Sequence, residues 1–400
     1  MMKIKSILII LALLVLSLAQ PAFADDEMET KSNMPVISEK AVAGKKAPVI
    51  NALAAIVIEV SSGRVLYAKN AAVKRSIAST TKIMTAVVAL ENGKLEDEVT
   101  ISKKAAGIGG STIGLRTGQK FTLKELLYAM LMSSANDAAV AVAEHIGGTV
   151  EGFAKMMNRK AESLGASDSN FITPHGLDAA NQYSTAYDVA IITRCALKNP
   201  VFAEIVSTTS SSIPGYGLYN TNELLGAYPG VDGVKTGYTG QAGRCLVTTI
   251  QKDGMRVITV VLGSPTRTAR ANASRDLMNY TFENFKMHRL LNAGDIYANV
   301  PVLRGIHEIA ALKVAQNVEI PLSDAELVSM EVKKSIPDIL NAPVYAGTDT
   351  GYVEYAVNGE VLAQSMLTIS EDVRRKTFLD YLQFVLNSWA KMMREGIFAG

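Results

Sequence analysis

The hydrophobic and polar positions divide the chain into stretches of different character. An apolar run covers residues 7–18, a polar and aperiodic stretch covers residues 25–48, and short apolar runs follow. Two of these runs, AAIVIEV and RVLYAKN, flank the turn-like sequence SSG. The pattern predicts a β-hairpin near residue 62.

Helical periodicity dominates the middle of the chain. The segment LKELLYAMLMSSANDAAVAVAEHIG is typical of it, and strand-like runs return at CLVTTIQ and RVITVVLG. Because strands at both ends enclose a helical middle, we expect one α/β domain over residues 49–290. Its sheet would be assembled from distant segments.

The next region has a β pattern. Residues 298–372 alternate short strand-like runs with turn residues, and Asn358-Gly359 stands between two such runs. An Asn-Gly pair in this position predicts a hairpin with a type I′ turn. We therefore expect a small, mostly β domain here.

The last segment, residues 374–396, has the pattern of an amphipathic helix. At about 100° per residue, its polar and apolar side chains fall on opposite faces. The narrow polar face holds Asp380, Gln383, Asn387, Lys391 and Arg394, and the apolar face holds Phe378, Leu382, Val385, Leu386, Trp389, Met392 and Met393. We expect a helix that lies in the membrane interface, with docking on the protein's own surface as the alternative.

The first 24 residues predict a secretory signal peptide. They combine a basic start, the apolar run and the small residues Ala22 and Ala24 around Phe23,. The shortness of the apolar run disfavours a retained anchor helix. An exported protein with a flexible leader over residues 25–48 follows from this pattern.

Charge and composition exclude several classes of function. The precursor has 40 Lys and Arg against 38 Asp and Glu, and loss of Lys3 and Lys5 with the signal peptide balances them. A balanced chain gives no electrostatic basis for binding nucleic acid. The four histidines are scattered without metal-binding spacing, so we predict no metal or cofactor,. Cys195 and Cys245 are compatible with one disulfide, but two buried free thiols fit better.

The sequence RSIASTTKIMTA places Lys82 at the head of an apolar run. On a helix that begins near Ser79, the serine and the lysine are i and i+3 and face the same way. The helix dipole would favour negative charge near Ser79, and a desolvated lysine can take its proton. The alternative is a capping serine and a lysine that extends to solvent.

Two further motifs strengthen the catalytic interpretation. Ser134-Ala135-Asn136 forms an S-x-N element after an apolar helix, and Lys235-Thr236-Gly237 leads into a strand-like run. S-x-x-K, S-x-N and K-T-G in this order are the signature of the penicillin-recognising serine enzymes.

The segments around these motifs narrow the match. IASTTKIMTA, LMSSANDAAVAVAEHIGG, NFITPHGLDAANQYSTAYDVA and VDGVKTGYTGQAGRCLV resemble the low-molecular-weight penicillin-binding proteins of the D-alanyl-D-alanine carboxypeptidase type. The resemblance covers essentially the whole mature chain. It implies an α/β penicillin-recognising serine transpeptidase/β-lactamase-like domain, a small all-β domain, and a C-terminal amphipathic helix at the outer face of the cytoplasmic membrane.

The resemblance also implies a reaction. Ser79, with Lys82 as general base, would attack the penultimate D-alanine carbonyl of a peptidoglycan stem pentapeptide and release the terminal D-alanine. Water would then hydrolyse the acyl-enzyme. Ser134, held by hydrogen bonds to Lys82 and Lys235, would relay a proton to the leaving amine. β-Lactam antibiotics would acylate the same serine.

Substrate contacts are implied for the other motif residues. Asn136 would hold the substrate amide, and Lys235 and Thr236 would bind the terminal carboxylate. Gly237 would leave room for the substrate along the strand edge.

The oxyanion hole and one more contact complete this expectation. The backbone N–H groups of Ser79 and Tyr238 would bind the oxyanion. Arg270 is the candidate for a second carboxylate contact, although Arg267 and Arg275 lie close to it in the sequence.

Three rival functions share these motifs. A class A β-lactamase should carry a deacylating glutamate followed by Leu-Asn between S-x-N and K-T-G, and no acidic residue there has that sequence,. A D,D-endopeptidase runs the same chemistry but tends to lack the β domain and terminal helix. A wall-binding or antibiotic-sensing module with a decayed site is disfavoured by the intact motifs.

Overall fold

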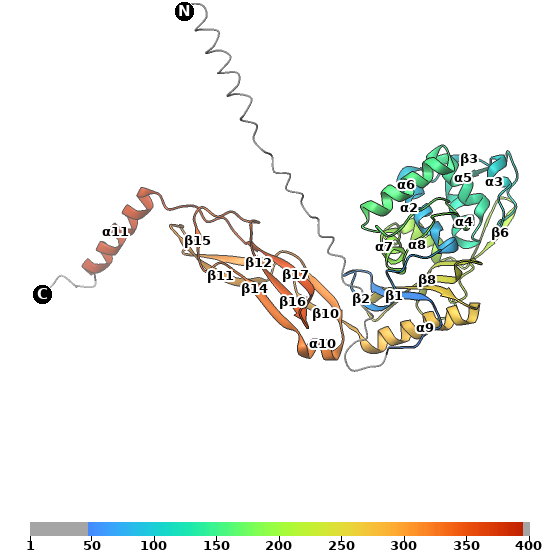
Figure 1. Ribbon diagram of the computed structural model, residues 1–400. Coiled ribbons are helices and arrows are strands. Elements are labelled where there is room, and N and C mark those ends of the chain that lie inside the picture. The colour runs from blue at the N-terminus through green and yellow to red at the C-terminus, as the bar shows by residue number, and fades with distance from the viewer. Residues whose placement is uncertain (1–46, 395–400) are drawn as a thin grey trace, which may run out of the picture. The chain divides into compact units, whose positions relative to one another are not determined.

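The strands predicted at both ends of the α/β segment lie side by side in one antiparallel sheet. The computed structural model describes residues 47–394; the predicted signal peptide, nearly all of the predicted leader, and residues 395–396 of the predicted terminal helix lie outside them. The strand order is β2-β1-β9-β8-β7 (Figure 1). The strands are β1 Ala54–Glu59, β2 Val65–Lys69, β7 Val231–Thr239, β8 Gly243–Lys252 and β9 Met255–Ser264.

Pairing of β1 with β9 joins the two distant parts of the sequence. Ile56 is opposite Val260 in this ladder, and both side chains are buried. The predicted hairpin between β1 and β2 is confirmed, with Gly63 at φ 74° in its turn. A sheet assembled from distant segments is therefore confirmed.

Helices cover both faces of this sheet. On one face, α9 buries Leu277 and Met278 against Leu246, Val257 and other apolar residues of the strands. The helix α7 packs against β1 and β9, together with the helical middle of the chain (Figure 1). The helices are α2 Lys82–Asn92, α3 Lys103–Ala106, α4 Leu123–Met132, α5 Asn136–Gly147, α6 Val150–Ser163, α7 Ala186–Ala196, α8 Pro200–Ser207 and α9 Arg267–Asn284.

Two small two-stranded sheets accompany the helices. They are β3 Glu98–Thr100 with β4 Lys120–Thr122, and β5 Ser210–Ile213 with β6 Tyr216–Tyr219. Thr122 also starts α4, because its side chain accepts from the Glu125 N–H while the Glu125 carboxylate accepts from the Thr122 N–H. This capping box satisfies two N–H groups that a helix start leaves without partners.

The residues that follow α9 form the β-rich part of the chain. Its larger sheet has the order β14-β16-β17-β12-β11-β15, and β10 pairs with β13. Buried Leu312, Val353 and Leu367 lie in its core. Its elements are β10 Lys286–Leu291, β11 Ile296–Leu303, β12 Ile309–Val314, β13 Val318–Leu322, α10 Asp324–Ser329, β14 Glu331–Ser335, β15 Leu340–Asn341, β16 Asp349–Val357 and β17 Glu360–Ile369.

Two sequence expectations bear on this part. The Asn358-Gly359 hairpin is confirmed: Val357 pairs with Glu360, and the two turn residues have φ of 51° and 80°. Positive φ at both positions is the type I′ conformation. The predicted boundary at residue 290 falls inside β10, whose partner β13 belongs to the β-rich part.

A terminal helix, α11, covers Phe378–Arg394. Thr377 begins it by accepting from the Asp380 N–H, and Asp380 pairs with Arg374 at 2.7 Å. No side chain of α11 is buried, and Trp389 is 65% exposed. Among the helices of residues 47–394, none has the length and apolarity needed to cross a bilayer.

Candidate active site

Ser79 lies in a 3₁₀ turn, Ala78–Thr81, and α2 begins directly after it at Lys82. A helix that begins near Ser79 is therefore confirmed, and its first turn is 3₁₀. The hydroxyls of Thr80 and Thr81 donate to the carbonyls of Ile77 and Ala78 at 2.7 and 2.8 Å, which tightens this turn. Because a 3₁₀ helix has three residues per turn, Ser79 and Lys82 share one face.

The Lys82 side chain is fully buried and its amine has three partners. Its Nζ lies 2.9 Å from Ser79 Oγ and donates to Asn136 Oδ1 at 2.7 Å and to the His175 carbonyl at 2.8 Å. Burial holds the pKa of Lys82 well below its ordinary value; the nearby charge of Lys235 lowers it further, and Asp137 opposes the shift. A neutral amine in hydrogen-bond contact with the serine can act as its general base.

His175 does not compete for the base role. Burial, with Lys82 beside it, lowers the pKa of His175 to about 4. Its Nδ1 accepts from the Leu177 N–H at 3.1 Å, and only its backbone carbonyl contacts Lys82. The imidazole therefore shapes the turn.

The S-x-N element brings two side chains to the same place. Ser134 is buried with φ 60°, the left-handed region. Among the described residues its hydroxyl makes no hydrogen bond to either Lys82 or Lys235, so the expected hydrogen bonds that position it are absent from this structure. Asn136 is the first residue of α5 and is tied to Lys82 through Oδ1.

The other contacts of Asn136 reach the glycine-containing loop before β4. Its Nδ2 donates to the Gly109 carbonyl at 2.8 Å, and its backbone N–H donates to the Ser111 carbonyl at 2.7 Å. A Cβ on Gly110, which has φ 80°, would lie 2.8 Å from Asn136 Nδ2. Asn136 thus links Lys82 to this loop.

Asp137 holds the same loop and was not predicted as a site residue. Its buried Oδ2 accepts from the N–H groups of Ile113, Gly114 and Leu115 at 3.2, 3.0 and 3.0 Å. Oδ1 accepts from Ala138 N–H at 3.0 Å. An acidic residue at the start of an apolar helix, directly after S-x-N, was the available signal.

The K-T-G residues lie on β7, at the edge of the sheet. Lys235 is buried, and burial with the nearby Arg270 lowers its pKa to about 7. The Thr236 hydroxyl lies 2.6 Å from that of Thr221. Lys235 Nζ donates to the Thr236 carbonyl at 3.2 Å.

Gly237 also has a structural role that the sequence did not predict. A Cβ there would lie 3.1 Å from the Ile77 carbonyl oxygen, the Ala78 Cβ and the Ser79 backbone nitrogen. The glycine therefore lets β7 approach the turn that carries Ser79, and the room it would leave for substrate stays a prediction. Gly176 serves the same turn from its other side: it has φ 84°, and a Cβ there would lie 1.9 Å from the Ala78 carbonyl oxygen.

Arg270 is buried in the first turn of α9 and bound to Glu223. Its Nε and Nη2 contact the carboxylate at 3.0, 2.7 and 2.6 Å, and Nη1 donates to the Cys245 carbonyl at 3.2 Å. The guanidinium lowers the pKa of Lys235 and so lies near it. A contact of Arg270 with substrate stays a prediction, and Glu223 had no signal in the sequence.

Tyr238 follows Gly237 on β7 and exposes its ring, with the Arg244 guanidinium 3.7 Å from the ring centroid. Its backbone and that of Ser79 flank the close contact at Gly237, which fits the expected pair of oxyanion donors.

Residues 47–394 contain neither a metal site nor a disulfide. Residues 47–394 contain no group of three or more His, Cys, Asp or Glu side chains that could hold a metal ion. Cys195 and Cys245 form no disulfide, as predicted, but only Cys245 is buried; Cys195 is partly exposed. Burial raises the pKa of Cys245 to about 11.

Comparison with known proteins decides the family. The family model described as D-alanyl-D-alanine carboxypeptidase matches residues 41–266, more than half of the chain. The chain belongs to this family. A second model, the C-terminal domain of penicillin-binding protein 5, matches residues 285–375. This carboxypeptidase-family chain therefore carries the β-rich part that the endopeptidase alternative tends to lack.

Individual relatives cover nearly the whole chain. D-alanyl-D-alanine carboxypeptidase DacF of Bacillus subtilis is 37% identical, over 85% of this chain and 90% of its own. DacA of Escherichia coli is 31% identical, over 86% of this chain and 89% of its own. The structure of penicillin-binding protein 5 from Haemophilus influenzae is similar with a TM-score of 0.75 and 33% identity, covering 83% of this chain and all of that one.

Proposed function

We propose that the protein is a serine-type D-Ala-D-Ala carboxypeptidase that removes the terminal D-alanine from peptidoglycan stem pentapeptides. The observation that carries this proposal is the contact of 2.9 Å between Lys82 Nζ and Ser79 Oγ, with the amine fully buried. The names of the relatives supply the substrate class. The pentapeptide and β-lactam antibiotics are its proposed ligands.

Acylation follows from the site residues. Ser79 Oγ attacks the carbonyl of the penultimate D-alanine and gives its proton to Lys82, while the N–H groups of Ser79 and Tyr238 bind the oxyanion. The Ser134 hydroxyl donates a proton to the leaving amine and takes one back from Lys82. The C–N bond breaks, D-alanine leaves, and an ester remains on Ser79.

Deacylation uses the same base. With D-alanine gone, a water molecule can reach the ester, and neutral Lys82 accepts its proton as the water attacks the carbonyl. The tetrahedral intermediate collapses by breaking the bond to Ser79 Oγ. Lys82 returns the proton it took from the water to Ser79 Oγ, and the shortened stem peptide leaves as the carboxylic acid.

Recognition of the terminal carboxylate falls to Lys235 and Thr236. Both are buried on β7, next to the Ser79 turn, where a protonated amine and a hydroxyl can bind one carboxylate,. Arg270 contributes through its effect on Lys235 and, when its bond to Glu223 loosens, as a second cation. Asn136 Nδ2 has a second N–H for the substrate amide.

We further propose that the protein works outside the cytoplasm, attached to the outer face of the cytoplasmic membrane through α11. The support is an amphipathic helix with no buried side chain, whose apolar face carries Trp389, Leu386 and Phe378. Such a helix lies in the interface without crossing the bilayer.

One assay tests the activity. Purified protein without residues 1–24 is incubated with a stem pentapeptide, and free D-alanine and peptide mass are followed. The proposal predicts steady release of one D-alanine per peptide. Cleavage of cross-linked dimers without release from the pentapeptide would favour an endopeptidase, and rapid turnover of penicillin would favour a β-lactamase.

A further inference from the structure

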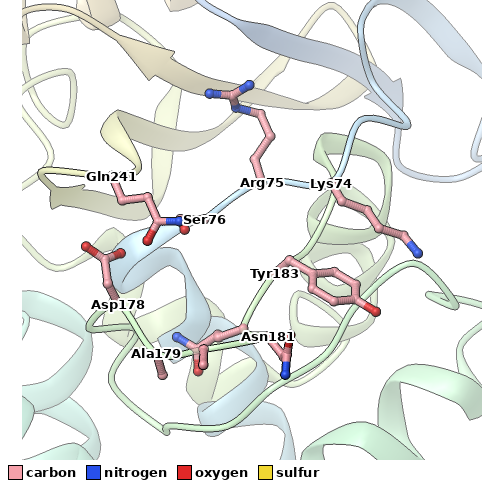
Figure 2. A pocket seen from close by; sticks show the side chains of 10 residues that line it. Lys74, Arg75, Ser76, Asp178, Ala179, Asn181, Tyr183 and Gln241 are labelled. Atoms are coloured by element: carbon pink, nitrogen blue, oxygen red, sulfur yellow. The ribbon is translucent and has the colours of Figure 1, made fainter.

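A polar pocket of about 520 Å³ lies beside the Ser79 turn. Its lining comes from three segments: residues 74–76 just before the catalytic turn, residues 178–183, and Gln241 in the turn after β7. Figure 2 shows Asp178 and Gln241 on one side and Lys74 and Tyr183 on the opposite side. The catalytic residues described above do not line it.

The pocket lies on the path that the stem peptide takes under the proposed function, on which this inference rests. The terminal carboxylate binds near Thr236, and the scissile carbonyl binds near the Tyr238 N–H. A peptide placed in this way runs antiparallel to β7. Each further residue advances it by about 3.3 Å, so the third stem residue comes beside positions 239–241.

Asp178 joins the pocket wall to this end of β7. Its Oδ1 accepts from the Thr239 hydroxyl at 2.8 Å, while Oδ2 has no partner among the described residues. The carboxylate is exposed and forms no ion pair within residues 47–394. An acceptor with negative charge is therefore open to a ligand here.

Neither of the two cations that line the pocket, Lys74 and Arg75, neutralises the Asp178 carboxylate. The Lys74 amine is 3.1 Å from Asp168 and 5.0 Å from the centre of the Tyr183 ring, so it has an anion of its own. In Figure 2 the Arg75 side chain extends away from Asn181 and Asp178. Gln182 is occupied as well, because its Oε1 accepts from the N–H groups of Ile172 and Thr173.

We infer that this pocket is the subsite for the side chain of the third stem residue, and that Asp178 binds the terminal ammonium group of a diamino acid there. The amide side chains of Gln241 and Asn181 border the same space. The ring of Tyr183 offers an apolar surface to the methylene groups of the side chain. L-Lysine and meso-diaminopimelic acid both carry such an ammonium group.

Three pentapeptides that differ only at the third residue test the subsite. They contain L-lysine, meso-diaminopimelic acid or L-norleucine, the last of which lacks the amine. Because one charge-assisted hydrogen bond is lost, kcat/KM for D-alanine release should be about tenfold lower with norleucine, mainly through KM. Asp178→Asn keeps the acceptor for Thr239 and should reduce the difference to within about twofold.

A matched variant controls for the loss of charge. Asp253 lies in the turn between β8 and β9, at the far end of β8 from Gln241, so Asp253→Asn makes the same change away from the pocket. The Asp253→Asn variant should keep the tenfold preference for the lysine and diaminopimelic acid peptides over the norleucine peptide. Acylation by benzylpenicillin, which has no third stem residue, normalises each variant for the integrity of the catalytic centre.

The outcomes separate this inference from the proposed function. Equal kcat/KM for all three pentapeptides, or a preference that survives in Asp178→Asn, would overturn the subsite while the carboxypeptidase stands. No D-alanine from any of them would contradict the proposed function and the subsite with it. Equal kcat/KM for the lysine and diaminopimelic acid peptides, both above norleucine, would support recognition of the ammonium group alone. A higher kcat/KM for the diaminopimelic acid peptide would support an added contact of its carboxylate on the Lys74 side.

Discussion

Lys82 and Lys235 are two buried amines that need different protonation states for the proposed reaction. Lys82 must be neutral to accept the Ser79 proton, and its pKa is lowered well below the ordinary value. Lys235 must be protonated to bind a carboxylate, and its pKa is lowered to about 7. Burial lowers the pKa of both amines; the charge of Lys235 adds to the shift at Lys82, and the charge of Arg270 adds to the shift at Lys235.

The pH dependence of the reaction follows from these signs. As pH rises, loss of the Lys82 proton should raise kcat/KM, whereas loss of the Lys235 charge should lower it through about pH 7. Bound carboxylate stabilises the protonated Lys235, so the decrease in kcat should come at higher pH. Initial rates of D-alanine release across pH measure both profiles.

Lys235→Arg checks the assignment of the alkaline limb. A guanidinium stays protonated throughout this range, so the decrease in kcat/KM near pH 7 should disappear even if the absolute rate falls. Persistence of the same limb in the variant would assign it to another group.

Asp137 is a second residue whose effect can be measured. Its carboxylate accepts from four backbone N–H groups, and without it these donors lose their partner. Asp137→Ala should lower the free energy of unfolding by about 3 kcal/mol. Chemical denaturation measures the change, and Asp137→Asn, which keeps one oxygen acceptor, should lose less. An unchanged stability in Asp137→Ala would show that water replaces the carboxylate.

At the scale of the elements, the contact between β7 and the Ser79 turn positions the nucleophile. A Cβ at Gly237 would lie 3.1 Å from the Ser79 nitrogen, so Gly237→Ala must shift the strand or the turn by a few tenths of an ångström. We expect acylation by benzylpenicillin to slow by about tenfold, because catalysis is sensitive to such displacements.

Gly240→Ala is the matched control for this strand. It lies just past the end of β7, and a Cβ there has nothing within 4 Å. Acylation should proceed at the rate of the unchanged protein. If both alanine variants acylate at that rate, the close approach at Gly237 is not what positions the serine.

For the whole molecule, the proposed attachment to the membrane rests on α11. Deleting residues 377–400 should release the protein from membranes while soluble activity is retained. Trp389→Glu on the apolar face should weaken binding to anionic lipid vesicles, whereas Asn387→Asp on the polar face should change it little. Sedimentation with vesicles measures both, and a truncated protein that still sediments would contradict the anchor.

The sequence predicted the fold where the pattern is local and repeated. The β1–β2 hairpin, the Asn358-Gly359 turn and the sheet built from distant strands are confirmed. The three short motifs also predicted that Ser79, Lys82, Asn136 and Lys235 belong to one site, because the order of the motifs is typical of a single class of serine enzymes. The resemblance to the low-molecular-weight penicillin-binding proteins predicted that a small β domain and a terminal helix follow the α/β domain.

What the sequence did not predict depends on contacts between distant segments. The bond between Arg270 and Glu223 joins residues 47 positions apart, and no local pattern marks Glu223. The crowding at Gly237 and Gly176 arises only when the Ser79 turn is packed between two backbones. The 3₁₀ turn is likewise set by this packing, since RSIASTTKIMTA alone reads as a continuous helix.

The central claim is that Ser79 is the acylated nucleophile of a carboxypeptidase. The most direct measurement incubates the unchanged protein and Ser79→Ala with benzylpenicillin and with a stem pentapeptide, and follows the mass of the protein adduct and free D-alanine together. We expect one penicilloyl adduct on Ser79 and steady D-alanine release in the unchanged protein, with neither in the variant. An adduct or D-alanine release that persists in Ser79→Ala would contradict the account.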